Sequence, residues 1–326
     1  MFHSAAPSRD KECFVAVPTL WEQDPSLQPL LFPIVAEAAE VGNGARLVVL
    51  TSEGKPHVLV GVHGNRHPWR APALVVLEHG DARSYAGIVA APVYGPPGAR
   101  GALLLYHDPM RPLAGGEDIA RAHAARIELA LTMASARLAA THSAVDALHQ
   151  ALAAHDARTG RHAIAVRALT RILGQAMRVP AHTLREWEWA ALLHDVGKIA
   201  VLSSLLHKPG PLDADEWTTI RRHPSTGERI IRAVPALEAV GLAVRHHHER
   251  WDGAGYPDRL SGASIPLASR VICLVDAYET MRTGRPYRAP MDRAETMEEL
   301  TRAAGSQFDP HLLTWLPALT RFDIAI

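Results

Sequence analysis

Histidine and aspartate side chains that could bind metal ions recur through the C-terminal half of this 326-residue chain. Imidazole and carboxylate groups together suit first-row transition metals, and no cysteine stands among the candidates to compete with them. An aspartate that directly follows a histidine can present two oxygens to two cations, which predicts a two-metal site of the kind that hydrolyses phosphoesters. The candidate ligands are His162, the pair His194 and Asp195, His223, the adjacent His247 and His248, and Asp276.

Two basic residues accompany these ligands and could hold a phosphate group. Lys198 follows Asp195 by three residues, and Arg285 could add a planar clamp with two hydrogen bonds. A helix rotates successive residues by about 100°, so His246, next to the adjacent histidine pair, is expected to point elsewhere. Any one of these residues alone is more often a surface or core residue than a ligand. Whether these residues are ligands must therefore be judged from their order and their flanking sequence.

The flanking sequence resembles the HD-GYP family, which is named after a His-Asp pair and a downstream Gly-Tyr-Pro. Here these residues are His194 and Asp195, followed later by Gly255, Tyr256 and Pro257. The resemblance covers about half of the chain in ordered blocks. The blocks are DARTGRH (156–162), ALLHDVGKIAV (191–201), LLHKPGPLDADEW (205–217), HHERWDGAGYP (247–257), IPLASRVICLVDAYETM (265–281), RPYR (285–288) and GSQFDP (305–310).

This resemblance implies hydrolysis of the 3′–5′ phosphodiester bonds of cyclic di-GMP to pGpG, GMP or both, at iron or manganese ions. It implies that Asp195 and Lys198 are catalytic, and that substrate is bound by Lys198, Arg285, Gly255 and Tyr256. The metal ligands that it implies are His194, Asp195, His223, His247, His248 and Asp276, with His162 as a further ligand if another metal is bound.

Arg158 departs from the pattern of some family members, which have a glutamate one helical turn before His162 that helps to hold a third ion. A cation at this position repels metal, so two ions are expected rather than three. Trp251 and Tyr256 could offer faces to guanine, or could simply pin their loop to the core. Two other functions stay open: hydrolysis of another cyclic nucleotide such as cyclic GMP-AMP, and a non-catalytic signalling module that keeps the fold.

The first part of the chain has the pattern of a small α+β domain. Residues 1–15 are polar and unpatterned and are expected to be disordered. Residues 16–116 resemble a GAF-type sensory domain with an antiparallel sheet, which implies a regulatory role and a ligand that the sequence does not identify. The expected elements are a helix over 27–40, and strands over 45–52, 57–63, 71–79, 84–94 and 99–108, the last two forming a hairpin.

A stretch without glycine or proline predicts a long connecting helix over 117–155. Within it, apolar residues recur at alternating spacings of four and three, as in a coiled coil. This seam favours a homodimer through the helix, with packing on the chain's own domains as the alternative. The seam comprises Ile127, Leu131, Ala134, Leu138, Thr141, Val145, Leu148 and Leu152.

The remaining residues, 156–326, predict an all-α domain, the part that resembles HD-GYP proteins. Asp213 followed by Glu216 has the spacing of a capping box, which marks the start of one helix. Helices are expected over 161–178, 182–195, 213–221, 224–233, 236–248, 266–283, 292–303 and 310–316.

Lysine plus arginine and aspartate plus glutamate both number 34, so the formal net charge is zero. This balance gives no electrostatic reason to expect a nucleic-acid polymer or an anionic membrane as partner, although a small anion needs only a local basic cluster. No window approaches the roughly 18 apolar residues that span a bilayer. With two distant cysteines, Cys13 and Cys273, and no signal-peptide pattern, the sequence predicts a cytoplasmic protein.

Overall fold

The computed structural model describes residues 27–41, 44–50, 56–62, 73, 76–77, 80–85, 88–95, 99–107, 109–284 and 289–319. The chain divides into two compact units, one up to Arg137 and one from Leu138 onward, so the division falls within the long helix. The disorder predicted for residues 1–15 lies outside the described residues, as does Arg285. None of the helices in the described part is both long and apolar enough to cross a membrane.

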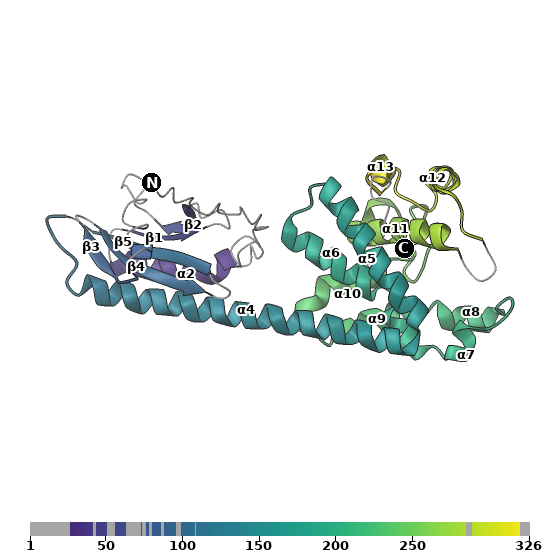
Figure 1. The fold of residues 1–326 in the computed structure, drawn as a ribbon, viewed down its shortest axis with the longest axis horizontal. Helices are drawn as coiled ribbons and strands as arrows, with labels where there is room; N and C mark the ends of the chain where they lie inside the picture. The colour runs from purple at the N-terminus through teal and green to yellow at the C-terminus, as the bar shows by residue number, and fades with distance from the viewer. Residues whose placement is uncertain are drawn as a thin grey trace, which may run out of the picture. The chain divides into compact units, whose positions relative to one another are not determined.

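The N-terminal unit is built on a five-stranded antiparallel sheet with the strand order β2-β1-β5-β4-β3 (Figure 1). The expected hairpin is confirmed, because β4 and β5 pair along their whole length, with Ile88 opposite Tyr106. The strands are β1 (Ala45–Leu50), β2 (Pro56–Val62), β3 (Arg83–Tyr85), β4 (Ile88–Gly95) and β5 (Ala99–Tyr106).

The structure differs from two of the strand predictions, those for residues 71–79 and 84–94. The sequence predicts a strand over 71–79, but the described residues there, Ala73, Val76 and Leu77, are helical, so that prediction is wrong. All three are buried, and their spacing of three and then one residue is that of one helix face. The stretch 84–94 contributes to two strands rather than one, since β3 and β4 pair with each other in antiparallel register.

Helices cover both faces of this sheet. The buried helical residues around position 76 pack with Ile88 and Tyr106 on one face. Side chains alternate between the two faces of a strand, and Val89, the neighbour of Ile88, lies against the start of the long helix α4 (Gly116–His155). Helix α2 (Leu27–Val41) packs on β1, β2 and β5. The sheet is therefore the middle layer of this unit.

The described residues of the second unit form helices and loops, which confirms the predicted all-α domain (Figure 1). Helix α11 (Leu267–Thr283) runs through its core, where the run from Val271 to Val275 is buried. The capping box at Asp213 and Glu216 is also confirmed. The other main elements are α5 (Ala157–Ala176), α6 (Ala181–Leu193), the 3-10 helix η1 (Val196–Ala200), α7 (Ser203–Leu206), α8 (Ala214–Ile220), α9 (His223–Ile231), α10 (Glu238–Arg245), α12 (Arg293–Arg302), the 3-10 helix η4 (Leu312–Trp315) and α13 (Leu316–Leu319).

The apolar seam of α4 is largely buried within the units. Leu152 is fully buried, and Val145 belongs to the core of the helical unit. Leu138 and Leu148 pack against the same core. The second half of the seam therefore packs on the chain's own helical unit, which is the alternative that the sequence left open. A dimer through this helix stays a prediction.

Candidate metal centre

Three histidines reach the centre of the helical unit in the same way. His194 follows α6, His223 begins α9, and His247 follows α10 by two residues. In each ring, Nδ1 contacts the backbone carbonyl three residues earlier; because a carbonyl can only accept, Nδ1 carries the proton and Nε2 is left as the donor atom for a metal. The carbonyls are those of Ala191 at 2.8 Å, Ile220 at 2.8 Å and Val244 at 2.6 Å.

Asp195 lies between two of these rings. Its Oδ1 is 3.3 Å from Nε2 of His223, and its Oδ2 is 3.4 Å from Nε2 of His194. Lys198 donates to Oδ2 from Nζ at 2.6 Å. Burial raises the pKa of Asp195, but Lys198 and the histidines outweigh burial and hold this pKa well below its usual range. Asp195 is therefore a carboxylate whose two oxygens face different histidines, as a bridging ligand requires.

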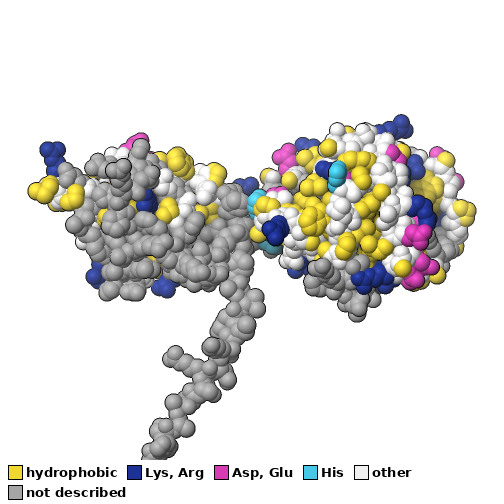
Figure 2. Space-filling view, turned by 90° about the horizontal axis from the view of Figure 1, so that it is seen from above, with side chains coloured by type: hydrophobic (Ala, Val, Ile, Leu, Met, Phe, Trp, Pro, Cys, Tyr) yellow, Lys and Arg dark blue, Asp and Glu magenta, His cyan; other side chains and the backbone are white. Residues whose placement is uncertain are grey.

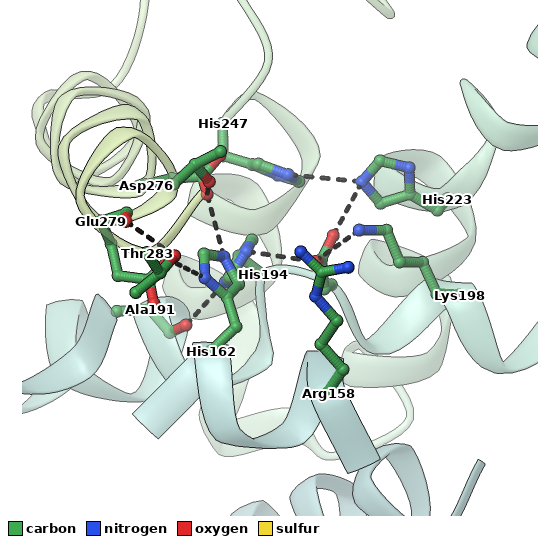
Figure 3. A network of polar contacts seen from close by, with 12 residues as sticks. Arg158, His162, Ala191, His194, Lys198, His223, His247, Asp276, Glu279 and Thr283 are labelled. Carbon is green, nitrogen blue, oxygen red and sulfur yellow. Dashed lines mark hydrogen bonds and ion pairs between the residues drawn. The ribbon is translucent and has the colours of Figure 1, made fainter. Parts of the chain in front are cut away.

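Helices α5 and α11 bring His162 and Asp276 to the same place (Figure 3). Nε2 of His162 is 2.9 Å from Oδ1 of Asp276, and its Nδ1 is 2.5 Å from Oε2 of Glu279. Burial lowers the pKa of His162, but the two carboxylates outweigh burial and raise it to about 10. Glu279, which is buried, is not among the site residues predicted from the sequence. Its signal was the spacing of three residues after Asp276, which puts both carboxylates on one helix face.

All seven candidate ligands are brought together by these contacts. Burial lowers the pKa of His223 to about 4 and that of His248 to about 3, so both rings are neutral donors near neutral pH. Neutral imidazoles and carboxylates are the donor set that divalent transition-metal ions take in proteins, so these residues fit such ions. His162, with its pKa raised to about 10, would have to lose a proton before it could bind one. Three groups have ligand atoms within 4.8 Å of one another: His223, His247 and His248; His162, His194 and Asp276; and His194, Asp195 and His247.

Two glycines allow the close approach of the elements that carry these ligands. A Cβ atom on Gly197 would lie 2.0 Å from the carbonyl oxygen of His223, so only glycine lets η1 lie this close to α9. A Cβ atom on Gly255 would lie 2.4 Å from the backbone nitrogen of Arg250. Gly255, which the sequence predicts to bind substrate, is buried and has a packing role in the structure.

Five of the seven candidate ligands line a cavity of about 1510 Å³. Lys198 and Tyr256, both predicted to bind substrate, also line it. Arg158 lines the cavity as well, points toward Lys198 in Figure 3, and donates to the carbonyl of Gly284 at 3.3 Å. The cavity is larger than most drug-sized ligand sites, so it has room for a dinucleotide. The candidate ligands in its wall are His162, Asp195, His223, His248 and Asp276.

Two residues of the same motif face away from this cavity. Nε2 of His246 lies 2.9 Å from Oδ2 of Asp258, and His246 belongs to none of the three ligand groups. This agrees with the rotation expected from helix geometry. Trp251 lies under the guanidinium group of Arg270, at 5.7 Å, and does not line the cavity. This placement agrees with the alternative that Trp251 pins its loop to the core.

Comparison with known proteins identifies similar sequences for the helical unit. The family described as the HD domain matches residues 146–312, just over half of the chain. A 3′3′-cGAMP-specific phosphodiesterase of Vibrio cholerae is 40% identical over 129 residues, which are 39% of this chain and 25% of that protein. A cyclic di-GMP phosphodiesterase of Pseudomonas aeruginosa is 37% identical over 158 residues, which are 48% of this chain and 38% of that protein.

Among solved structures, a cyclic GMP-AMP-specific phosphodiesterase of Vibrio cholerae aligns with a TM-score of 0.43 at 18% identity. This alignment covers 54% of this chain and 47% of the other. The chain thus spans less than half of the length of the two curated relatives and of this structure.

Proposed function

Because the chain belongs to the HD domain family, we propose that its helical unit is a metal-dependent phosphodiesterase of the HD-GYP type that hydrolyses cyclic di-GMP to pGpG, GMP or both. The observation that carries the proposal is the convergence of seven histidine and aspartate side chains, from five separate segments, on one centre beside a cavity. The names of the similar proteins from Vibrio cholerae and Pseudomonas aeruginosa support cyclic dinucleotides as the substrate class.

In this proposal one set of side chains binds the metal ions and another stabilises the phosphate group. When bound, a pair of divalent ions supplies Lewis acidity and activates water. His194, Asp195, His223, His247, His248 and Asp276 would hold the ions, with His162 as a further ligand if another metal is bound. Lys198 lies in the cavity wall and can stabilise the negative charge that develops on the phosphoryl oxygens. Arg285 lies outside the described residues and stays a predicted phosphate ligand.

The proposal keeps the two ions, iron or manganese, that the family resemblance implies. Histidine nitrogen and carboxylate donors agree with a transition metal rather than calcium, which prefers oxygen alone. Arg158 lies one turn before His162 on α5, lines the cavity and donates one hydrogen bond to the carbonyl of Gly284. A positive charge there disfavours a third cation, so the proposal is a two-metal centre.

The N-terminal unit is proposed to regulate the phosphodiesterase as a GAF-like domain, with a ligand still to be identified. Its antiparallel sheet between helices is compatible with that fold. A homodimer through α4 and a cytoplasmic location remain predictions from the sequence. On the face of the helical unit seen in Figure 2, hydrophobic side chains predominate and a few acidic and basic side chains are scattered among them, with no extended basic patch.

The experiment that tests this function is a substrate panel with the metal-loaded full chain. Cyclic di-GMP, 3′3′-cyclic GMP-AMP and pGpG are incubated separately, and the products are separated by chromatography. Conversion of cyclic di-GMP to pGpG or GMP, lost in Lys198→Ala, is expected. Faster conversion of cyclic GMP-AMP would favour this second candidate substrate. The 40% identity to a cGAMP-specific phosphodiesterase is the observation that supports it. No turnover of any cyclic dinucleotide would contradict the proposal.

A further inference from the structure

The cavity extends beyond the candidate ligands onto an apolar wall. This wall is formed by α7, α8 and the loop between them, at one edge of the helical unit (Figure 1). If the phosphates of a cyclic dinucleotide lie at the ligands, its bases must be held by a surface of another kind, since bases bind through flat apolar contacts. The apolar residues in this wall are Leu205, Leu206, Pro211, Leu212, Trp217 and Ile220.

Trp217 is the one aromatic side chain in this apolar wall, and 47% of its surface is exposed. It lies in α8, whose first turn is closed by the capping box of Asp213 and Glu216. Both carboxylate oxygens of Glu216 also accept hydrogen bonds from Lys208, at 2.7 Å, which ties the preceding loop to the helix. An exposed ring on a fixed element is a preformed surface, so a base that covers it loses little binding energy to ordering.

Planar groups form a column between Trp217 and the candidate ligands. The guanidinium carbon of Arg221 lies 5.7 Å from the ring centre of Trp217 and 5.5 Å from that of Tyr256. The ring of Tyr256 lies 4.9 Å from that of His248, with the two planes tilted by 31°. Arg221 contacts both Trp217 and Tyr256, but Trp217 is exposed whereas Tyr256 and His248 are half-buried, so Trp217 is the ring of this column with the most surface left for a ligand.

We propose that Trp217 forms a nucleobase subsite, on which one purine of the cyclic dinucleotide stacks while its phosphates lie at the metal ligands. The proposal rests on the proposed function and deepens it. It replaces Trp251, which the sequence offers as a face for guanine but which lies outside the cavity wall. Stacking accepts any base because every base has a π face, so Trp217 supports guanine and adenine alike. Discrimination between cyclic di-GMP and cyclic GMP-AMP would then come from other groups.

Two substitutions in the full chain, Trp217→Ala and Trp217→Phe, test this subsite. Trp315→Ala is the matched control, because Trp315 is also exposed, at 40%, but does not line the cavity. Loss of a stacked base is worth about a tenfold change, so KM for cyclic di-GMP should rise about tenfold in Trp217→Ala. It should rise by less than about threefold in Trp217→Phe, with kcat and metal content unchanged in both. KM for cyclic GMP-AMP should rise by the same factor.

A binding measurement separates this inference from the proposed function. Tryptophan fluorescence is titrated with pGpG in the parent chain, Trp217→Phe and Trp315→Phe, and quenching should be reduced in Trp217→Phe alone. Equal quenching in the two variants would overturn the subsite, as would an unchanged KM in Trp217→Ala or a parallel loss of kcat and metal. If the parent chain does not hydrolyse cyclic di-GMP, the proposed function fails, and the fluorescence result still decides whether Trp217 binds a base.

Discussion

Each carboxylate oxygen of Asp195 faces a different histidine, His194 or His223, within 3.4 Å. Asp195→Ala would leave these rings without their shared anion and would leave Lys198 as a nearby positive charge. We therefore expect metal loading and turnover to be lost together, which metal analysis and an activity assay on the same preparation will show. Asp146→Ala, an exposed change on α4, is the control. Hydrolysis at the parent rate by Asp195→Ala would refute this role.

Glu279 is expected to orient His162, because its carboxylate accepts a hydrogen bond from Nδ1 while Nε2 faces Asp276. Partners of this kind typically change metal affinity by about 10- to 100-fold when they are removed. Glu279→Ala should weaken metal binding by that factor in a chelator competition, whereas Glu279→Gln, which can still accept the hydrogen bond, should retain most of the affinity. Equal affinity in Glu279→Ala and the parent would show that the contact has no positioning role.

Sequence predicts residues at this scale only where a motif fixes their environment. The convergence of the seven candidate ligands was predictable because their neighbours repeat a known pattern. Glu279 and Trp217 were missed because their roles depend on contacts with α5 and with the cavity, which local sequence does not encode. Trp251 has the right chemistry, but the fold turns it toward Arg270.

At the scale of elements, Gly197 controls whether the centre can assemble. Gly197→Ala would put a Cβ atom in contact with the backbone of α9 and push His223 away from Asp195. Overpacking of this kind costs about 1–3 kcal/mol, so the melting temperature and the metal content should both fall. Gly241→Ala in α10 is the control, since its Cβ would meet neighbours only at 3.5 Å and beyond. Normal metal content in Gly197→Ala would contradict this account.

The buried half of the α4 seam makes a prediction about stability. Leu152 is fully buried, so Leu152→Ala should lower the free energy of unfolding of the helical unit by about 2–5 kcal/mol. Leu129→Ala is the control, because Leu129 is 61% exposed on the same helix. Denaturant unfolding at two protein concentrations measures the effect. A loss that grows on dilution would instead point to a dimer interface at this position.

The order of elements was predictable, but the type of one short segment was not. Residues 71–79 contain a short apolar run, and periodicity alone does not separate a buried strand from a buried helix over so few residues. Ala73, Val76 and Leu77 are buried against the sheet and lie on one helix face. Their helical conformation therefore depends on packing against the sheet, which the local sequence does not encode. The helices of the second unit were predictable because caps such as Asp213 are local signals.

At the scale of the whole chain, an α+β part followed by a helical part was predictable from the change of pattern after Gly160, although the division into compact units falls within the long helix, after Arg137. The coiled-coil spacing in α4 did not reveal its partner, because the same apolar stripe can bury itself against another chain or against its own domain. In this structure Val145 and Leu138 pack against the core of the chain's own helical unit. Selectivity among cyclic dinucleotides was equally beyond the sequence, since it depends on how a ligand lies in the assembled cavity.

The central claim is that one centre in the helical unit holds a pair of metal ions that catalysis requires. The most direct test is metal quantification on the anaerobically purified full chain, followed by removal of the ions with a chelator and their return. The account predicts about two transition-metal ions per chain, loss of cyclic di-GMP hydrolysis on removal and its recovery on addition of iron or manganese. Fewer than about one ion per chain, or hydrolysis that persists after complete metal removal, would contradict it.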